Sequence, residues 1–257
     1  MKHIRSLENP FFKELLKLAS VARYRSKLGQ TLLDGSHLLA SYLASHQQPL
    51  HVIVTADALE DAEISFLMRK MPTVAVSVLD DALFERLSEL KSVSGVLALV
   101  TIPQAEFDPK QSNFCVLLEN IQDPGNLGSI LRSAAAAGCD AVYMSKGCAD
   151  AWSPKVLRAA MGGHFVLKIH EHVNLQVVAQ HFEGTIFAAS LAGKTSLFNS
   201  QFNGKIAFAI GNEGAGLSDE LLSATHPFII PMPGQVESLN AAAAAAICLF
   251  EAVRQRS

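Results

Sequence analysis

Side chains that could contact a ligand gather at three turns of the chain, each of which directly follows a predicted strand. The first turn reads NIQDPGNLGSILRSAAAAG over residues 120–138, after the apolar run Cys115 to Leu118. Asn126 is a candidate N-cap of the following helix, which would place Arg132 within about two turns of the helix start. In open α/β sheets, ligands bind at the edge where strands end and helices begin. Arg132 is therefore a candidate ligand contact, and the alternative is an ordinary arginine on a helix surface.

The second turn reads IGNEGAGLS over residues 210–218, after the predicted strand Ile206 to Ile210. Its three glycines, of which Gly211 is the first, permit a sharply turned backbone that comes close to a ligand. Glu213 supplies a carboxylate among them. The loop lacks the Gly-Lys-Ser/Thr ending of a P-loop and the spacing of a dinucleotide-binding fingerprint. A plain turn is the alternative interpretation of Gly211.

The third turn begins IPMPGQVESLN at Ile230 and leads into a predicted helix that continues to Arg256. Two prolines and Gly234 predict an extended loop with few internal hydrogen bonds, and its free main-chain groups could bind the edge of an adenine ring. Ser238 and Asn240 could contact a substrate or simply cap the helix. The helical spacing predicts one buried face, made of Leu239, Ala243, Ala246, Ile247 and Phe250.

The elements that carry these turns alternate between short apolar runs and helical patterns, which predicts an α/β fold. After residue 113 the pattern predicts a mostly parallel sheet with helices on both faces. A similar alternation before residue 100 predicts a small α/β domain. The intervening stretch TIPQAEFDPKQSN has two prolines and no periodicity, as is typical of a linker. We therefore predict domains at 1–100 and 114–257, joined by a linker at 101–113. The predicted C-terminal strands are Cys115 to Leu118, Ala141 to Met144, Phe165 to Ile169, Thr185 to Ala189, Ile206 to Ile210 and Phe228 to Ile230.

The charge is uneven along the chain. The 257 residues carry a net charge of −3, which argues against a protein that coats nucleic acid. Residues 1–30, however, carry seven basic and two acidic side chains. Such a local surface can attract phosphate, and Arg23, Arg25 and Lys27 are candidate RNA contacts. The alternative is the solvated face of an amphipathic helix.

Several classes of site and location are disfavoured by the sequence. The longest apolar run, from Ala241 to Phe250, has ten residues, whereas a membrane span needs about 20. The four cysteines are scattered without a C-x-x-C pair, so we expect reduced thiols and a cytoplasmic location. His164, His170 and His172 have no partner at metal-ligand spacing, so we expect no metal site.

The three turns, in this order and spacing, resemble the three signature motifs of the SpoU (TrmH-type) RNA methyltransferases of the SPOUT superfamily. This resemblance covers about residues 113–256. The N-terminal part, with Asp34-Gly35 and the run VSGVLALV, resembles the family's ribosomal-protein-like RNA-binding domain. Two departures are Asp34 in place of a usual glutamate and Pro233 in the third motif.

The resemblance implies a fold, a cofactor and an activity. It implies a C-terminal trefoil knot, a homodimer and S-adenosylmethionine-dependent methylation of a ribose 2′-hydroxyl on structured RNA, with ribosomal RNA favoured and transfer RNA as the alternative. Arg132 would orient a phosphate and stabilise developing alkoxide charge, because a guanidinium rarely gives up its proton. The implied cofactor-binding residues are Gly211, Ile230, Met232, Gly234 and Leu239, and the implied catalytic residues are Asn126, Arg132, Glu213, Ser238 and Asn240.

Two other functions compete with this interpretation. The first is a non-catalytic RNA-binding protein that keeps the fold but has lost the chemistry, and the presence of Arg132, Glu213, Ser238 and Asn240 disfavours it. The second is a nucleotide-dependent dehydrogenase on a doubly wound sheet. The sequence disfavours it because no G-x-G-x-x-G follows the first strand.

Overall fold

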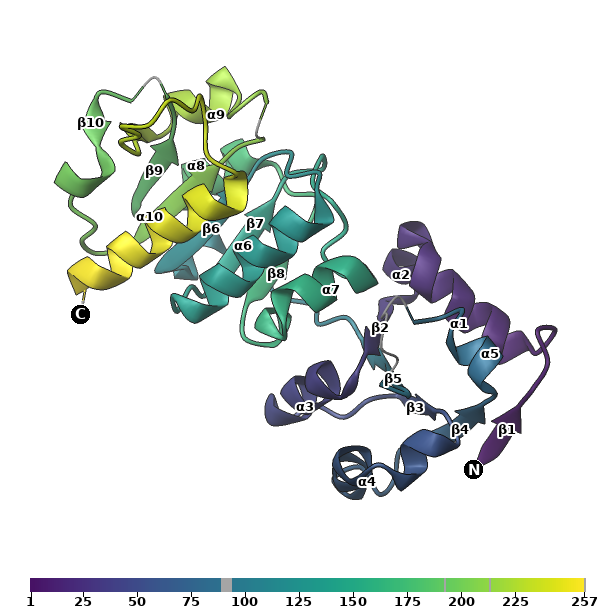
Figure 1. Cartoon of the computed structure of the whole chain (residues 1–257). Helices are drawn as coiled ribbons and strands as arrows, with labels where there is room; N and C mark the ends of the chain where they lie inside the picture. Colours follow the sequence, from purple (N-terminus) through teal and green to yellow (C-terminus); the bar gives the residue numbers. More distant parts are fainter. Residues whose placement is uncertain (89–93, 192, 213, 257) are drawn as a thin grey trace. The chain divides into compact units, whose positions relative to one another are not determined.

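The chain forms two compact units in the computed structural model, which describes residues 1–88, 94–191, 193–212 and 214–256 (Figure 1). The first unit comprises Met1–Gln104 with Trp152–Phe165, and the second comprises Ala105–Ala151 with Val166–Ser257. The division at residues 104 and 105 falls within the range predicted as a linker. The segment Trp152–Phe165 differs from the predicted boundaries, because it packs with the first unit. There the Thr31 hydroxyl donates a 2.7 Å hydrogen bond to the Trp152 carbonyl.

The first unit is built on a five-stranded sheet in the order β1-β4-β3-β5-β2. Strands β1, β3 and β4 are parallel to one another, whereas β5 runs antiparallel to both β3 and β2. Buried Phe12, Leu15 and Leu18 of α1 pack into the main core of this unit. The strands are β1 (Lys2–Ile4), β2 (Gln30–Asp34), β3 (His51–Val54), β4 (Ala75–Leu79) and β5 (Val96–Thr101), and the helices are α1 (Pro10–Ser20), α2 (Ala22–Leu28), α3 (Ser36–Ala44), α4 (Ala62–Arg69), α5 (Asp81–Phe84) and α7 (Pro154–Ala160).

Arg25 was predicted to contact RNA from an exposed basic surface, but it is buried. Its side chain is only 4% exposed, and Nη1 donates to the carbonyl oxygens of Leu18 and Ala19 at the end of α1. A guanidinium there satisfies carbonyls that the helix leaves without partners. We therefore assign Arg25 to capping α1 rather than to RNA. Arg23 and Lys27, on the same helix α2, are exposed.

The second unit is built on a seven-stranded sheet in the order β10-β12-β9-β11-β6-β7-β8. Every pair of neighbouring strands in this order is parallel, which confirms the predicted mostly parallel sheet. The strand predicted to start at Phe165 begins at Lys168 instead, because Gly163–Phe165 form a 3-10 turn. The short β10 was not predicted. The strands are β6 (Phe114–Leu118), β7 (Ala141–Met144), β8 (Lys168–His170), β9 (Thr185–Ala189), β10 (Thr195–Ser196), β11 (Ile206–Ile210) and β12 (His226–Ile229).

Helices cover both faces of this sheet. Helices α8 (Leu175–His181) and α9 (Asp219–Ser223) place Leu175, Val178 and Leu221 against alternate residues of β6, β7, β9 and β11. On the other face, α6 (Pro124–Ala136) and α10 (Ala241–Arg256) pack against each other (Figure 1). Helix α10 also contacts β11. No helix among the described residues is long and apolar enough to cross a membrane.

The buried face of α10 differs from the predicted one. The helix buries Ala241, Ala245, Cys248, Leu249 and Ala252, whereas Phe250 is 47% exposed. Of the predicted stripe, Ala243 and Phe250 are therefore exposed, and Leu239, Ala246 and Ile247 are only half-buried. Six consecutive alanines at residues 241–246 offer no polar residue that would mark the solvent side, so the sequence pattern could not distinguish the two faces.

We expect Arg25→Ala to lower the free energy of unfolding by about 1 to 3 kcal/mol, because it leaves buried carbonyl oxygens without a charged donor. Urea unfolding would measure this loss. Arg23→Ala, at an exposed position of the same helix, is the matched control and should change stability by no more than about 0.5 kcal/mol. Equal stability of the two variants would contradict the assigned capping role.

Candidate active site

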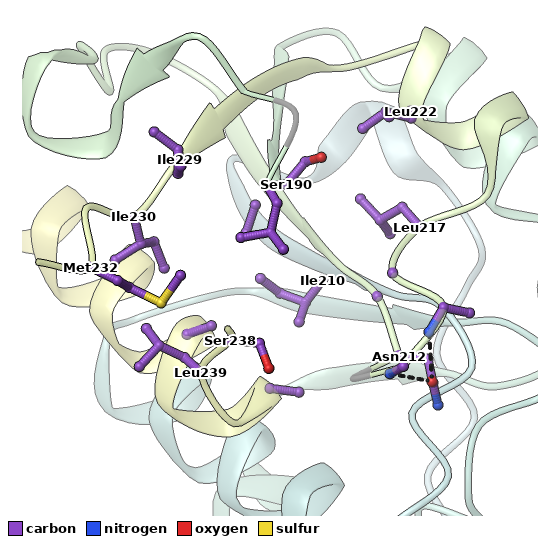
Figure 2. Close-up of a pocket in the computed structure, with 18 residues that line it drawn as sticks. Ser190, Ile210, Asn212, Leu217, Leu222, Ile229, Ile230, Met232, Ser238 and Leu239 are labelled. Carbon is purple, nitrogen blue, oxygen red and sulfur yellow. Dashed lines mark hydrogen bonds between the residues drawn. The ribbon is translucent and has the colours of Figure 1, made fainter. Parts of the chain in front are cut away.

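A cavity of about 410 Å³ opens at the carboxyl edge of the parallel sheet in the second unit (Figure 2). Its wall comes from the loops that follow three neighbouring strands, together with the start of α10. Parallel strands all end at the same edge, which is why loops distant in sequence meet there. The lining residues are 189–191 after β9, residues 210–212 and 214–217 after β11, Leu222 of α9, Ile229, Ile230 and Met232 at and beyond the end of β12, and Ser238, Leu239, Ala241 and Ala244 around the start of α10.

The structure places four of the five predicted cofactor-binding residues on this wall. Ile230, Met232 and Leu239 form an apolar side of the cavity (Figure 2). Gly211 lines the cavity from the β11 loop. Gly234 is exposed and does not line the cavity. A Cβ at Gly211 would lie 2.3 Å from main-chain atoms of Gly216. The glycine is therefore required for the loop to fold back on itself.

The β11 loop closes through its own main chain. Asn212 and Gly216 exchange hydrogen bonds of 2.8 and 3.2 Å, and Asn212 Oδ1 accepts from the amides of Gly214 at 2.9 Å and Ala215 at 3.2 Å (Figure 2). The loop thus turns its backbone along the cavity wall. Glu213, a predicted catalytic residue, lies outside the described residues.

The predicted N-cap of α6 is wrong. Asp123 caps this helix by accepting a 2.7 Å hydrogen bond from the amide of Asn126, and Pro124 occupies the first helical position, where a missing N–H costs nothing. Asn126 instead accepts a 2.8 Å hydrogen bond from the side chain of Asn240. The first and third motifs therefore meet directly.

Asn240 and Ser238 lie on either side of Leu239 at the start of α10. The Asn240 side chain accepts from the amides of Ala242 at 2.9 Å and Ala243 at 3.2 Å, so Asn240 caps the helix while also holding Asn126. Ser238 lines the cavity (Figure 2). Both residues are exposed.

Arg132 lies on an exposed position of α6, a little more than two turns from the helix start at Pro124. It does not line the cavity. The structure thus brings Asn126 and Asn240 together, places Ser238 at the cavity, and leaves Arg132 outside the cavity of its own chain.

The loop after β9 contributes wall residues that the sequence analysis missed. Ser190 and Leu191 line the cavity, and so does Leu217 on the β11 loop. The strand itself was predicted, and β9 lies between β11 and β12 in the sheet. The order of strands in the sheet indicates this loop as part of the site, because β11 and β12, the two neighbours of β9, are followed by the second and third motifs.

The titratable groups of this unit do not suggest covalent or metal chemistry. Burial raises the pKa of the Cys115, Cys139, Cys148 and Cys248 thiols, which disfavours the nucleophilic thiolate. His170 stacks on Tyr143. Within the described ranges, no group of three or more His, Cys, Asp or Glu side chains is arranged to hold a metal ion. The arrangement is suited to binding a ligand through apolar side chains and main-chain groups.

Comparisons with known proteins agree with this arrangement. Residues 113–250 match the model of the SpoU rRNA Methylase family. An uncharacterized tRNA/rRNA methyltransferase of Synechocystis sp. is 33% identical over 98% of this chain and 94% of its own length. The 23S rRNA (guanosine(2553)-2′-O)-methyltransferase RlmP of Bacillus subtilis is 30% identical over 97% of this chain and 98% of its own.

A solved structure extends the match to three dimensions. The SpoU methyltransferase AviRb of Streptomyces viridochromogenes, in complex with the cofactor AdoMet, is 28% identical with a TM-score of 0.86, covering 97% of this chain and 98% of that one. Both the sequence and the fold of this chain therefore match those of SpoU methyltransferases over nearly its whole length. The chain belongs to the SpoU rRNA methylase family.

Proposed function

We propose that this protein transfers a methyl group from S-adenosylmethionine to a ribose 2′-hydroxyl of structured RNA, and that the RNA is ribosomal. The observation that carries the proposal is the cavity formed by the second and third motifs. The activity named for the Bacillus subtilis relative and the AdoMet bound to AviRb support it. Transfer RNA is the second candidate, because the Synechocystis relative is named for both RNA classes.

The cavity fits the cofactor in size and in the character of its wall. A volume of about 410 Å³ lies within the usual range of about 300 to 1,000 Å³ for small-molecule sites. Ile230, Met232 and Leu239 would pack against the adenosine part, while Gly211 and its neighbours offer main-chain groups. The cofactor, when bound, supplies an electrophilic methyl group.

The residues around the cavity would align the ribose hydroxyl for in-line attack. Ser238 and Asn240 would bind the ribose, and the Asn126–Asn240 contact of 2.8 Å would keep the first motif beside the third. Arg132 would hold the flanking phosphate and stabilise negative charge developing on the attacking oxygen. We propose a positioning or RNA-binding role for Glu213.

The exposed position of Arg132 supports a homodimeric arrangement. Arg132 lies outside its own cavity, and α10, which packs beside α6, exposes Ala243 and Phe250. A second copy of the chain seated on α6 and α10 would cover these apolar residues and carry Arg132 to the partner's cavity. We also propose that the C-terminal end of the chain is threaded into a trefoil knot.

The first unit would bind the RNA substrate. Arg23 and Lys27 would contact phosphate, because both are exposed on α2. Arg25 would not, because it is buried. The proposal places the protein in the cytoplasm, where its four unpaired cysteines would stay reduced.

Leu239→Arg should abolish binding of S-adenosylhomocysteine, because a long charged side chain would occupy the apolar side of the cavity. Isothermal calorimetry measures the loss. Val236→Arg is the matched control, since Val236 lies on the same loop, is 63% exposed and does not line the cavity. Equal affinity of the two variants would contradict the placement of the cofactor.

Arg132→Ala should bind S-adenosylmethionine almost normally but lose on the order of 10²-fold or more in methyl-transfer rate, because it removes preorganised positive charge. Single-turnover kinetics on the RNA substrate would measure the rate. Arg132→Lys keeps the charge but not the planar fork of donors. Substantial activity in the lysine variant would assign the effect to charge, and little activity would assign it to geometry.

Mixed dimers of Arg132→Ala and Leu239→Arg test whether the site is shared between subunits. A mixed dimer holds one wild-type cavity and one wild-type Arg132 on opposite chains, so activity should return from two inactive parents. Formation of mixed dimers without any activity would show that Arg132 does not act across the interface.

Replacing Arg23 and Lys27 with glutamine should weaken RNA binding and reduce the slope of log affinity against log salt by about 1 to 2, because fewer counterions are released. Cofactor affinity should stay unchanged. Filter-binding titrations at several salt concentrations provide the slope. The same slope as in the wild-type protein would assign these side chains to an ordinary solvated helix face.

A further inference from the structure

The loop between β11 and α9 forms a large part of the cavity wall and is closed on itself. Residues 211, 212 and 214–217 all line the cavity, and the paired main chains of Asn212 and Gly216 close the loop. Gly211, Gly214 and Gly216 of this loop have wide conformational freedom, because glycine has no Cβ. If the loop is to keep one conformation along the cavity wall, residues outside the loop must hold it in place.

Glu119, the residue directly after β6, provides anchors at both ends of this loop. Its carboxylate accepts a 2.7 Å hydrogen bond from the Ser218 amide and a 2.8 Å hydrogen bond from the Ser218 hydroxyl. Its own amide donates to the Ile210 carbonyl at 3.0 Å. The Glu119 residue is only 8% exposed, and hydrogen bonds to a carboxylate are stronger than those between neutral groups.

The next residue adds a third anchor and belongs to the first motif. The carbonyl of Asn120 accepts a 3.1 Å hydrogen bond from the Asn212 side chain. Asn120 itself has a left-handed backbone, with φ of 57°, and its amide donates to the Ser145 hydroxyl at 3.0 Å. Residues 119 and 120 therefore join the loop on the cavity wall to the segment that leads into α6.

We propose that Glu119 is a positioning residue that holds the β11 loop in the shape that binds the cofactor. Glu119 does not line the cavity, so its carboxylate acts through Ser218 rather than by touching the ligand. Ser218 also caps α9 by accepting from the Leu221 amide at 3.3 Å, and this fixes the far end of the loop. The inference rests on the proposed cofactor site but concerns a residue outside it.

The test compares Glu119→Ala and Glu119→Gln with the wild-type protein. Calorimetry with S-adenosylhomocysteine should show Kd raised about tenfold to a hundredfold in Glu119→Ala, as expected for the loss of charge-assisted hydrogen bonds. Glu119→Gln keeps one acceptor oxygen and should show a smaller rise. In the protein without ligand, the amides of Gly214, Gly216 and Ser218 should exchange hydrogen faster in both variants.

Asp140→Asn is the matched control. Asp140 precedes β7 at the amino edge of the same sheet, and its carboxylate accepts a 2.6 Å hydrogen bond from the Asn113 amide. Its neutralisation removes the charge from a similar carboxylate-to-amide contact at the opposite edge of the sheet. It should lower the melting temperature and leave both Kd and the exchange of the loop unchanged.

The exchange measurement separates this inference from the proposed function. If the wild-type protein does not bind S-adenosylhomocysteine, the proposed cofactor is wrong, and faster exchange confined to the β11 loop still supports the anchoring role. If Glu119→Ala fails to fold, Glu119→Gln gives the comparison. A folded Glu119 variant with wild-type Kd and wild-type loop exchange would overturn the inference.

Discussion

The site depends on the parallel pairing of β6, β11, β9 and β12, because this pairing makes their carboxyl ends meet at one edge of the sheet. Each of these strands is followed by a loop that the site uses, and Asn126 and Asn240, which meet at the site, are 114 residues apart in sequence. The registers Ile210 with Leu118 and Ala209 with Ala188 bring the strand ends into line. A shift of one strand would move a whole loop away from the cavity.

The loops are held by polar side chains that connect one motif with another. The Asn126–Asn240 contact joins the first motif to the third, and Glu119 with Asn120 joins the first to the second. The first motif thus touches both of the others while contributing nothing to the cavity wall. The first motif thus supplies hydrogen bonds that hold the other two in place. The cavity wall itself has few polar side chains that could do so, because it consists mostly of glycines and apolar residues.

Much of the fold could be predicted from the sequence, because buried parallel strands have a strong local signature. The strands Ala141–Met144, Thr185–Ala189 and Ile206–Ile210 have their predicted bounds, and the motif residues Ile230, Met232 and Leu239 meet at one cavity. These features depend on apolar runs and on the order of motifs, and both can be recognised in the sequence without knowing which residues are in contact in the folded protein.

The predictions that were wrong depended on contacts that a sequence pattern does not contain. Arg25 is hydrophilic by type but is buried because α1 ends beside it with free carbonyls. Asn126 was a plausible cap, but Asp123 and Pro124 start the helix earlier. The run of alanines in α10 left its buried face undetermined, and the loop after β9 carries no motif. Position 213 lies outside the described residues, so the role of Glu213 stays a prediction.

If this chain methylates ribose on ribosomal RNA, a map of ribose methylation across total RNA will show the modified nucleotide. The map would compare cells with the gene, cells without it, and deleted cells that carry either the wild-type gene or its Leu239→Arg variant. We expect a 2′-O-methyl group in ribosomal RNA to disappear on deletion and to return only with the wild-type gene. An identical set of ribose methylations in all four RNA samples would contradict it.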